Sequence, residues 1–236
     1  AQVARRIARR ATTARASLSF LISNTASKGC PQGTPSFAAR QNMTAIRSYR
    51  LADRTVSAAL PSHTALLDGL SRLLVEAPEA TGQQPSVAAQ WNETQNCFLL
   101  SGDGLARSFT CAETLDAVCS VSAGLIGGYA RASLDRLCFH AAAILHDGRA
   151  YLIPTTYSSG KSTLCLTWME QGGQLITDDA AIFDIANHTV SSFGIPLRIR
   201  TSLLNDGPSR LRDFALANAI LRGQRLAYIR DPRHEA

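Results

Sequence analysis

The chain has 236 residues, of which 45% are hydrophobic and 18% are charged, and its formal net charge is +6. A chain of this length can form one large domain, or one domain with a smaller lobe. Its apolar runs are far shorter than the roughly 20 residues that a membrane-spanning helix needs. We therefore expect a soluble protein with no membrane partner.

The positive charge is concentrated at the start of the chain. Of the 24 Lys and Arg residues, nine lie within residues 1–52, which contain no acid, so 15 remain against 18 acids in the rest. Because nucleic-acid-binding domains present a basic surface, the folded part is expected to have no nucleic-acid partner. Residues 1–40, rich in Arg, Ser, Thr and Ala, are expected to form a flexible tail. A transit peptide, an incorrectly assigned start, or an arm for an acidic partner are the alternatives.

The six cysteines show neither the C-x-x-C pairs of a zinc site nor the density of a disulfide-stapled domain. We expect reduced thiols, and hence a cytoplasmic protein. The cysteines are Cys30, Cys97, Cys111, Cys119, Cys138 and Cys165.

Residues 41–133 are expected to form a small N-terminal α/β lobe. Residues 47–58 favour a pair of strands. Leucines at helical spacing then predict a helix over 62–76, with Ser62 or Thr64 as its N-cap.

Farther along this lobe, the turn sequence Ser101–Gly104 separates two short apolar runs, 98–100 and 105–109, and so predicts a hairpin. A second helix is expected over 114–130, in spite of three glycines near its end.

Residues 134–236 are expected to form the core domain of the chain. Strands are predicted over 139–145 and 150–153, and they are followed by a loop over 154–160 and a helix over 161–171. These elements lead directly into the segment with the most informative motifs.

That helix is expected to end at Gly172 and Gly173, and a strand over 174–177 follows. Residues 180–185 and 189–193 are predicted to pair as a hairpin. The order of strand, loop, helix and strand implies a mixed sheet flanked by helices, so we expect an α/β fold.

The segment from Tyr151 to Thr163 combines a strand, a loop and the start of a helix, and it matches the last three positions of the phosphate-loop consensus G-x-x-x-x-G-K-[ST]. Backbone N–H groups at a helix N-terminus attract anions. Lys161 can reach the β- and γ-phosphates, and the Ser162 hydroxyl can bind Mg²⁺. We therefore predict a site for ATP and Mg²⁺. Its residues are Thr155, Thr156, Tyr157, Ser158, Ser159, Gly160, Lys161, Ser162 and Thr163.

Thr155 stands where the consensus has its first glycine. Glycine allows backbone angles that threonine resists, so either the loop follows another path or nucleotide binding is weaker. A Ser/Thr-rich loop that caps an ordinary helix is the alternative without phosphate binding.

Asp178 and Asp179 follow a short apolar strand, one helix after the loop. Carboxylates at the end of a strand beside a phosphate loop can hold Mg²⁺ or take a proton from an attacking hydroxyl. Only 17 residues separate Lys161 from Asp178, so we expect the strand over 174–177 to lie next to the loop's own strand, with both motifs on one rim of the sheet. A surface turn that opens the following hairpin is the alternative.

His140 lies inside an apolar run, in the strand that precedes the loop hairpin. If this strand neighbours the other two, His140 can hydrogen-bond a carboxylate of the acid pair and orient it. The alternative is a hydrogen-bonded core histidine.

Together, Phe139–Ala143, Gly160–Thr163 and Asp178–Asp179 resemble the catalytic core of the HPr kinase-like proteins, over about residues 98–200. The resemblance implies a P-loop kinase core with the fold of phosphoenolpyruvate carboxykinase. It also implies an ATP-dependent kinase that phosphorylates serine on a protein or peptide.

The resemblance further implies roles for single residues. Lys161 and the loop would hold the triphosphate, and Ser162 would bind Mg²⁺. Asp178 would be the general base, with Asp179 and His140 as its supporting pair. Asp179 is also the candidate second ligand of Mg²⁺. Arg198 and Arg200 are candidates for stabilising charge on the γ-phosphate, with a solvated basic strand as the alternative.

The chain also departs from the family pattern. Thr155 and Ser158 replace loop glycines, and the signature segment of the bifunctional HPr kinase/phosphorylases is not recognisable. The chain is more similar to the divergent relatives that phosphorylate a serine of lasso-peptide precursors. We therefore expect a kinase whose partner is a peptide or protein with an acceptor serine. A non-catalytic nucleotide-binding regulatory module and a small-molecule kinase are the alternatives. The sequence leaves open whether the chain forms a homo-oligomer.

Overall fold

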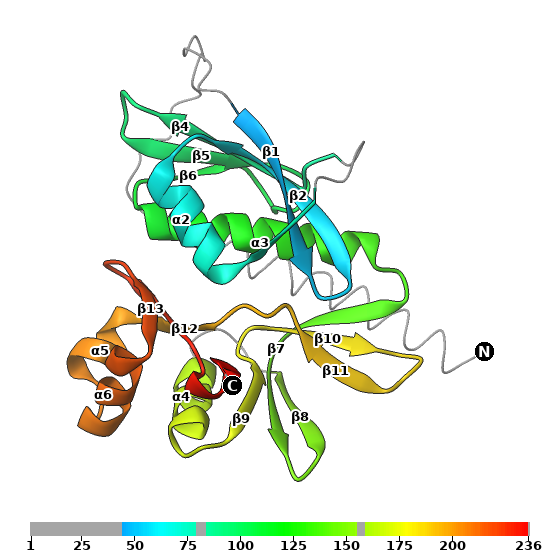
Figure 1. Cartoon of the computed structure of the whole chain (residues 1–236), viewed down its shortest axis with the longest axis vertical. Helices are drawn as coiled ribbons and strands as arrows, with labels where there is room; N and C mark the ends of the chain where they lie inside the picture. Colours follow the sequence, from blue (N-terminus) through cyan, green and yellow to red (C-terminus); the bar gives the residue numbers. More distant parts are fainter. Residues whose placement is uncertain (1–43, 79–83, 155–158, 236) are drawn as a thin grey trace. The chain divides into compact units, whose positions relative to one another are not determined.

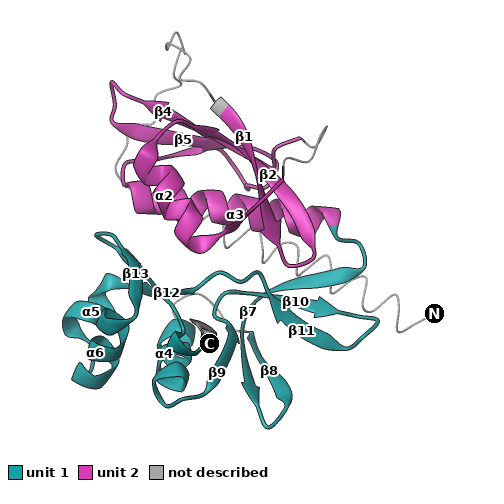
Figure 2. Ribbon diagram, in the orientation of Figure 1, with its two compact units in different colours: residues 1–18, 133–236 teal, residues 19–132 magenta. Residues whose placement is uncertain are grey.

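The computed structural model describes residues 44–78, 84–154 and 159–235. Within these ranges the chain divides into two compact units, with the boundary between Ala132 and Ser133 (Figure 2). The sequence placed this boundary one residue later. The expected tail over 1–40 lies outside the described residues. Among the described residues, no helix has the length and apolar character needed to cross a membrane.

The N-terminal unit is built on a six-stranded sheet with the order β3-β1-β2-β4-β5-β6 (Figure 1). Neighbouring strands are antiparallel except β2 and β4, which are parallel, so the sheet is mixed. The strands are β1 (Thr44–Leu51), β2 (Arg54–Pro61), β3 (Val75–Ala77), β4 (Val87–Asn92), β5 (Cys97–Ser101) and β6 (Phe109–Cys111).

Two helices, α2 (Thr64–Leu73) and α3 (Thr114–Ala132), cover this sheet (Figure 1). The N-cap of α2 is His63 rather than Ser62 or Thr64. His63 has an extended backbone, and its Nδ1 accepts a hydrogen bond of 3.3 Å from the Leu66 N–H. The ring thereby satisfies one of the N–H groups that the helix start leaves unpaired. The helix is shorter than predicted because the chain is extended from residue 74 and then forms β3.

The predicted hairpin forms between β5 and β6, but its second strand starts at Phe109 instead of residue 105. The reason is a close approach between the turn and α3. A Cβ added to Gly104 would lie 1.9 Å from the Gly124 carbonyl oxygen, and one added to Gly127 would lie 2.1 Å from the Gly104 carbonyl oxygen. The glycines near the end of α3 therefore leave space for the turn. The second strand, β6, begins only after the turn has passed α3.

The C-terminal unit is organised around one long strand, β7 (Arg136–His146). The order of its five-stranded sheet is β11-β10-β7-β8, and β9 also pairs with β7. Ala141, Ala142 and Ala143 at the centre of β7 are almost fully buried. The other strands are β8 (Arg149–Pro154), β9 (Gln174–Thr177), β10 (Ala180–Asp184) and β11 (Thr189–Ser192), and every pairing is antiparallel.

One expectation about this sheet is wrong, because β9 does not lie next to the loop's own strand β8. The two flank β7 on opposite edges and run in the same direction, since both are antiparallel to β7. Asp147 and Gly148, with φ values of 49° and 70°, form the two-residue turn between β7 and β8. Such tight turns favour hairpin pairing, so β8 takes the edge of β7 that it meets first.

The crossover helix α4 (Lys161–Glu170) connects β8 to β9. It ends in a two-bond turn, in which the Gly173 N–H donates to the Trp168 carbonyl and the Gly172 N–H donates to the Met169 carbonyl. Gly172 has a φ of 84°, a conformation that glycine adopts without steric cost. The cap residue itself is Gln171, one position before the glycines named by the sequence pattern.

A second, three-stranded antiparallel sheet in this unit has the order β12-β14-β13. Cys165, Leu166 and Met169 of α4 form a buried core with Ala142 of β7 and with apolar residues of this sheet. Helix α4 thus joins the two sheets. The remaining elements are β12 (Leu197–Arg200), α5 (Thr201–Asp206), α6 (Ser209–Ala217), β13 (Ala219–Arg222), β14 (Leu226–Ile229) and a 3-10 turn, η1 (Pro232–Glu235). The described chain is therefore α/β, with one mixed sheet, two antiparallel sheets and flanking helices.

Candidate functional site

The acid pair Asp178–Asp179 lies at a break between two strands that share one edge of β7. Thr177 of β9 pairs with Ala143, and Ala180 of β10 pairs with His140. The two aspartates fall between these pairs and outside both strands. Breaks in strand pairing re-aim side chains, and they are common next to active sites.

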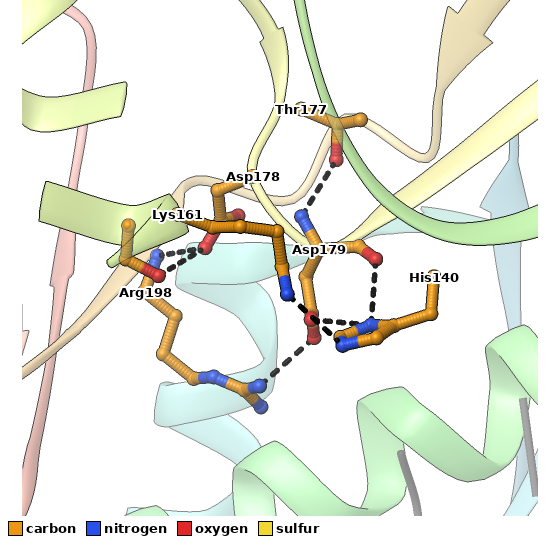
Figure 3. A network of polar contacts seen from close by, with 7 residues as sticks. His140, Lys161, Thr177, Asp178, Asp179 and Arg198 are labelled. Atoms are coloured by element: carbon orange, nitrogen blue, oxygen red, sulfur yellow. Dashed lines mark hydrogen bonds and ion pairs between the residues drawn. The ribbon is translucent and has the colours of Figure 1, made fainter. Parts of the chain in front are cut away.

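Asp179 has partners on two other elements (Figure 3). Its Oδ1 lies 3.0 Å from the His140 Nδ1, and its Oδ2 accepts a hydrogen bond of 2.8 Å from the Arg198 guanidinium. Burial alone would raise the pKa of Asp179, but Arg198 and the hydrogen bond from His140 outweigh burial and hold that pKa below its ordinary value. Asp179 is therefore a fixed negative charge at neutral pH.

Asp178 is more deeply buried, with 6% of its surface exposed. Its Oδ2 is 3.4 Å from the Ser162 hydroxyl and 3.3 Å from the Arg198 backbone N–H, and both groups donate to it. Burial raises the pKa of Asp178 to about 7, and the neighbouring charge of Asp179 adds to this effect. The two adjacent carboxyl groups thus differ strongly in their tendency to hold a proton.

Lys161, the first residue of α4, is 9% exposed, and its Nζ lies 3.3 Å from the His140 Nε2 (Figure 3). An ammonium group can only donate, so the ring nitrogen facing Lys161 accepts. The other nitrogen, Nδ1, then carries the proton and donates to Asp179, whose Oδ1 and backbone oxygen lie at 3.0 Å and 3.2 Å. His140 thus connects the loop lysine to the acid pair.

The start of α4 has the geometry of an anion-binding helix N-terminus. Gly160 is the N-cap residue with a φ of 87°, which favours glycine, and its carbonyl accepts the Leu164 N–H at 2.9 Å. The first N–H groups of the helix point away from its body and carry partial positive charge. Lys161 and Ser162 begin the helix at this end, while Ser159 and Thr163 are exposed.

The structure brings six of the predicted site residues into one network of contacts, and each lies where a hydrogen bond or ion pair joins it to the next. The six are His140, Lys161, Ser162, Asp178, Asp179 and Arg198. Arg200 lies exposed at the end of β12. The predicted loop residues Thr155, Thr156, Tyr157 and Ser158 lie outside the described residues.

Sequence reasoning missed two contributors to this network. The Thr177 Oγ1 lies 3.5 Å from the Asp179 N–H, which donates to it, and so helps to hold the turn into β10. The second is the backbone N–H of Arg198, which no side-chain pattern can reveal. A threonine directly before an acid pair was the one available signal, because its hydroxyl can bond a backbone N–H two residues on.

An oxygen ligand for Mg²⁺ is present at Ser162, whose hydroxyl lies beside Asp178. Asp179, the other predicted ligand, has both carboxylate oxygens in contact with His140 and Arg198. No group of three or more His, Cys, Asp or Glu side chains suited to a metal exists in the described part of the chain. Mg²⁺ sites in nucleotide enzymes commonly use one or two protein ligands and fill the rest with phosphates and water, which these residues fit.

Comparisons with protein-family models, with curated proteins and with solved structures found no match to this chain. The chemistry of the site is therefore inferred from the geometry described above.

Proposed function

We propose that the protein is an ATP-dependent kinase that transfers the γ-phosphate to a serine hydroxyl of a peptide or protein. One observation carries the proposal: His140, Lys161, Ser162, the acid pair and Arg198 meet at the N-terminus of α4. The network joins a phosphate-binding cation to a carboxyl group able to take a proton. This is the equipment that phosphoryl transfer to a hydroxyl requires.

In this proposal the N-terminus of α4 and Lys161 bind the phosphates. The helix supplies oriented N–H groups, and Lys161 supplies a positive charge that is nearly enclosed by protein. Electrostatic attraction is stronger in such an enclosed site than in water. Mg²⁺, held by Ser162 together with the phosphates and water, would neutralise charge that develops on the transferred group.

Asp178 is the proposed general base. A base works best when its pKa is near the working pH, and burial raises the pKa of Asp178 to about 7. Asp179 cannot fill this role as well, because Arg198 and His140 stabilise its charged form. We assign Asp179 and His140 to fixing the electrostatics around Asp178, as the resemblance to HPr kinase-like proteins implied.

The test is transfer of radiolabelled phosphate from MgATP to degenerate peptide libraries. One library carries a fixed serine at its centre, and matched libraries carry threonine, tyrosine or alanine there. The proposal expects label in the serine library and none in the alanine library. A lasso-peptide precursor with its serine intact or replaced by alanine would be the next probe.

Calorimetric titration with MgATP separates the alternatives. Binding without transfer to any library would favour the regulatory module, and transfer only to small hydroxyl compounds would favour a small-molecule kinase. If MgATP fails to bind at all, the kinase proposal is wrong.

A further inference from the structure

Arg198 contacts both members of the acid pair. Its backbone N–H donates to the Asp178 Oδ2 at 3.3 Å, and its guanidinium donates to the Asp179 Oδ2 at 2.8 Å. Figure 3 shows Arg198 reaching the two carboxylates from one side, with His140 on the other. Two adjacent carboxylates repel each other, so a shared donor has a direct effect on their arrangement.

The backbone at Arg198 is held firmly in place. Its neighbours Leu197 and Ile199 are each 2% exposed and pack in the core that α4 shares with β12 and β14. Arg198 itself pairs with Tyr228 in the sheet, at the Cα level. The N–H that meets Asp178 is therefore presented by a rigid strand rather than by a loop.

The guanidinium of Arg198 is also held in place, by its contact with Asp179. Its side chain is 24% exposed, and it lies against a carboxylate that is 26% exposed. Hydrogen bonds between ionised partners at this distance are among the stronger ones in proteins. The five N–H donors of a guanidinium lie in a fixed planar fork, so the ion pair with Asp179 fixes the orientation of the whole group.

We propose that Arg198 is a positioning residue for phosphoryl transfer, which fixes the relative placement of Asp178 and Asp179, and not a ligand of the γ-phosphate. This inference rests on the proposed function. It replaces both earlier alternatives for Arg198, the phosphate ligand and the solvated strand residue. Arg198 acts through the acid pair, so its loss should slow transfer and spare nucleotide binding.

The experiment compares Arg198→Ala, Arg198→Lys and wild type in the full chain. Single-turnover transfer is measured with the serine library, and MgATP affinity by calorimetry. We expect Arg198→Ala to slow transfer about 10²-fold, the size of effect that a misplaced catalytic group causes. MgATP affinity should change by less than about threefold, because ground-state binding is untouched. Lysine keeps the charge without the planar fork, so Arg198→Lys should be intermediate.

Chemical rescue excludes a merely structural role. Millimolar guanidinium should restore part of the transfer rate of Arg198→Ala in a saturable way, whereas urea at equal concentration should not. Arg222→Ala is the matched control, because Arg222 is an exposed arginine of the same three-stranded sheet. It should leave both measurements unchanged.

A loss of MgATP affinity as large as the loss of transfer would overturn the proposal, since it would make Arg198 a phosphate ligand. Absence of rescue in an Arg198→Ala protein that still binds MgATP would also overturn it. If wild type transfers phosphate to no acceptor, the kinase proposal fails and the role of Arg198 in transfer fails with it. If wild type transfers phosphate but Arg198→Ala loses MgATP affinity and transfer equally, only the positioning role fails.

Discussion

In the N-terminal unit, four buried serine hydroxyls are hydrogen-bonded within their own elements or across neighbouring strands. Ser120 and Ser122 donate to carbonyls one turn earlier in α3, and Ser48 and Ser57 meet across β1 and β2 at 3.1 Å. The buried carboxylate in this unit, Asp116, lies in the first turn of α3, where the helix dipole favours negative charge. These polar groups stabilise the elements that carry them.

In the C-terminal unit, the polar groups of the network come from four separate segments: β7, α4, the β9–β10 break and β12. Burying charge is costly, and a partner of opposite charge often only offsets the cost. The comparison of the two units therefore indicates that the C-terminal unit carries a polar cluster that folding alone does not require.

The largest expected effect comes from Asp178→Asn, which removes the proposed base and keeps its size. Single-turnover transfer should fall by about 10²–10⁴-fold, the usual contribution of a positioned base, while MgATP affinity changes little. Asp147→Asn is the matched control, because its side chain is exposed at the β7–β8 turn. Full transfer activity in Asp178→Asn would show that the buried charge has another purpose.

Lys161→Ala should come next in size. The variant removes the nearly enclosed cation at the start of α4, and losing one partner of such a charge pair costs about 2 kcal/mol or more. MgATP affinity should therefore fall by about 30-fold or more. The control is Arg149→Ala, an exposed cation of β8. Wild-type affinity in the lysine variant, measured by calorimetry, would remove the phosphate-loop interpretation.

The pH dependence should be gradual. Asp178 must be deprotonated to accept a proton, and burial raises its pKa to about 7. The kcat/KM for transfer should therefore rise about tenfold per pH unit below 7 and level off above it. Asp179, with its lowered pKa, should contribute no titration in this range. A flat profile between pH 5 and 8 would contradict the role of Asp178.

Gly104→Ala tests the same comparison by a change in the N-terminal unit. Its new methyl group would meet the Gly124 carbonyl oxygen, so the N-terminal unit should lose about 1–3 kcal/mol of stability. We expect no change in MgATP affinity at low temperature, since every residue of the network lies in the C-terminal unit. Thermal unfolding and calorimetry measure the two outcomes. A parallel loss of both would show that the site depends on the N-terminal unit.

The sequence predicted the elements well where local patterns decide them. The strand pair over 47–58, the helix over 114–130 and the hairpin over 180–193 appear with small shifts at their ends. The meeting of His140 with the acid pair was also expected. The proximity of Lys161 and Asp178 could be predicted from the short interval between them, because one helix and one strand return the chain to the same rim of the sheet.

Other features depend on register and tertiary contacts, which local patterns do not encode. The position of β7 between β8 and β9 follows from the tight turn at Asp147–Gly148 and from competition for the edges of one strand. Arg198 and Arg200 are two residues apart in β12, so the alternation of side chains along a strand places both on the same face. The sequence pattern therefore could not show which of the two contacts the acid pair. The answer lies in where β12 is anchored to α4.

The three alanines at the centre of β7 have a consequence for how this protein can change over time. Ala141, Ala142 and Ala143 are buried on both faces of a strand that is hydrogen-bonded along both edges. A larger side chain at Ala142 would overpack the core that β7 shares with α4, at a cost of about 1–3 kcal/mol. Evolutionary drift at these positions should thus be confined to the smallest residues. Changes in what the site binds would have to arise in the segments around the strand, while β7 keeps its sequence.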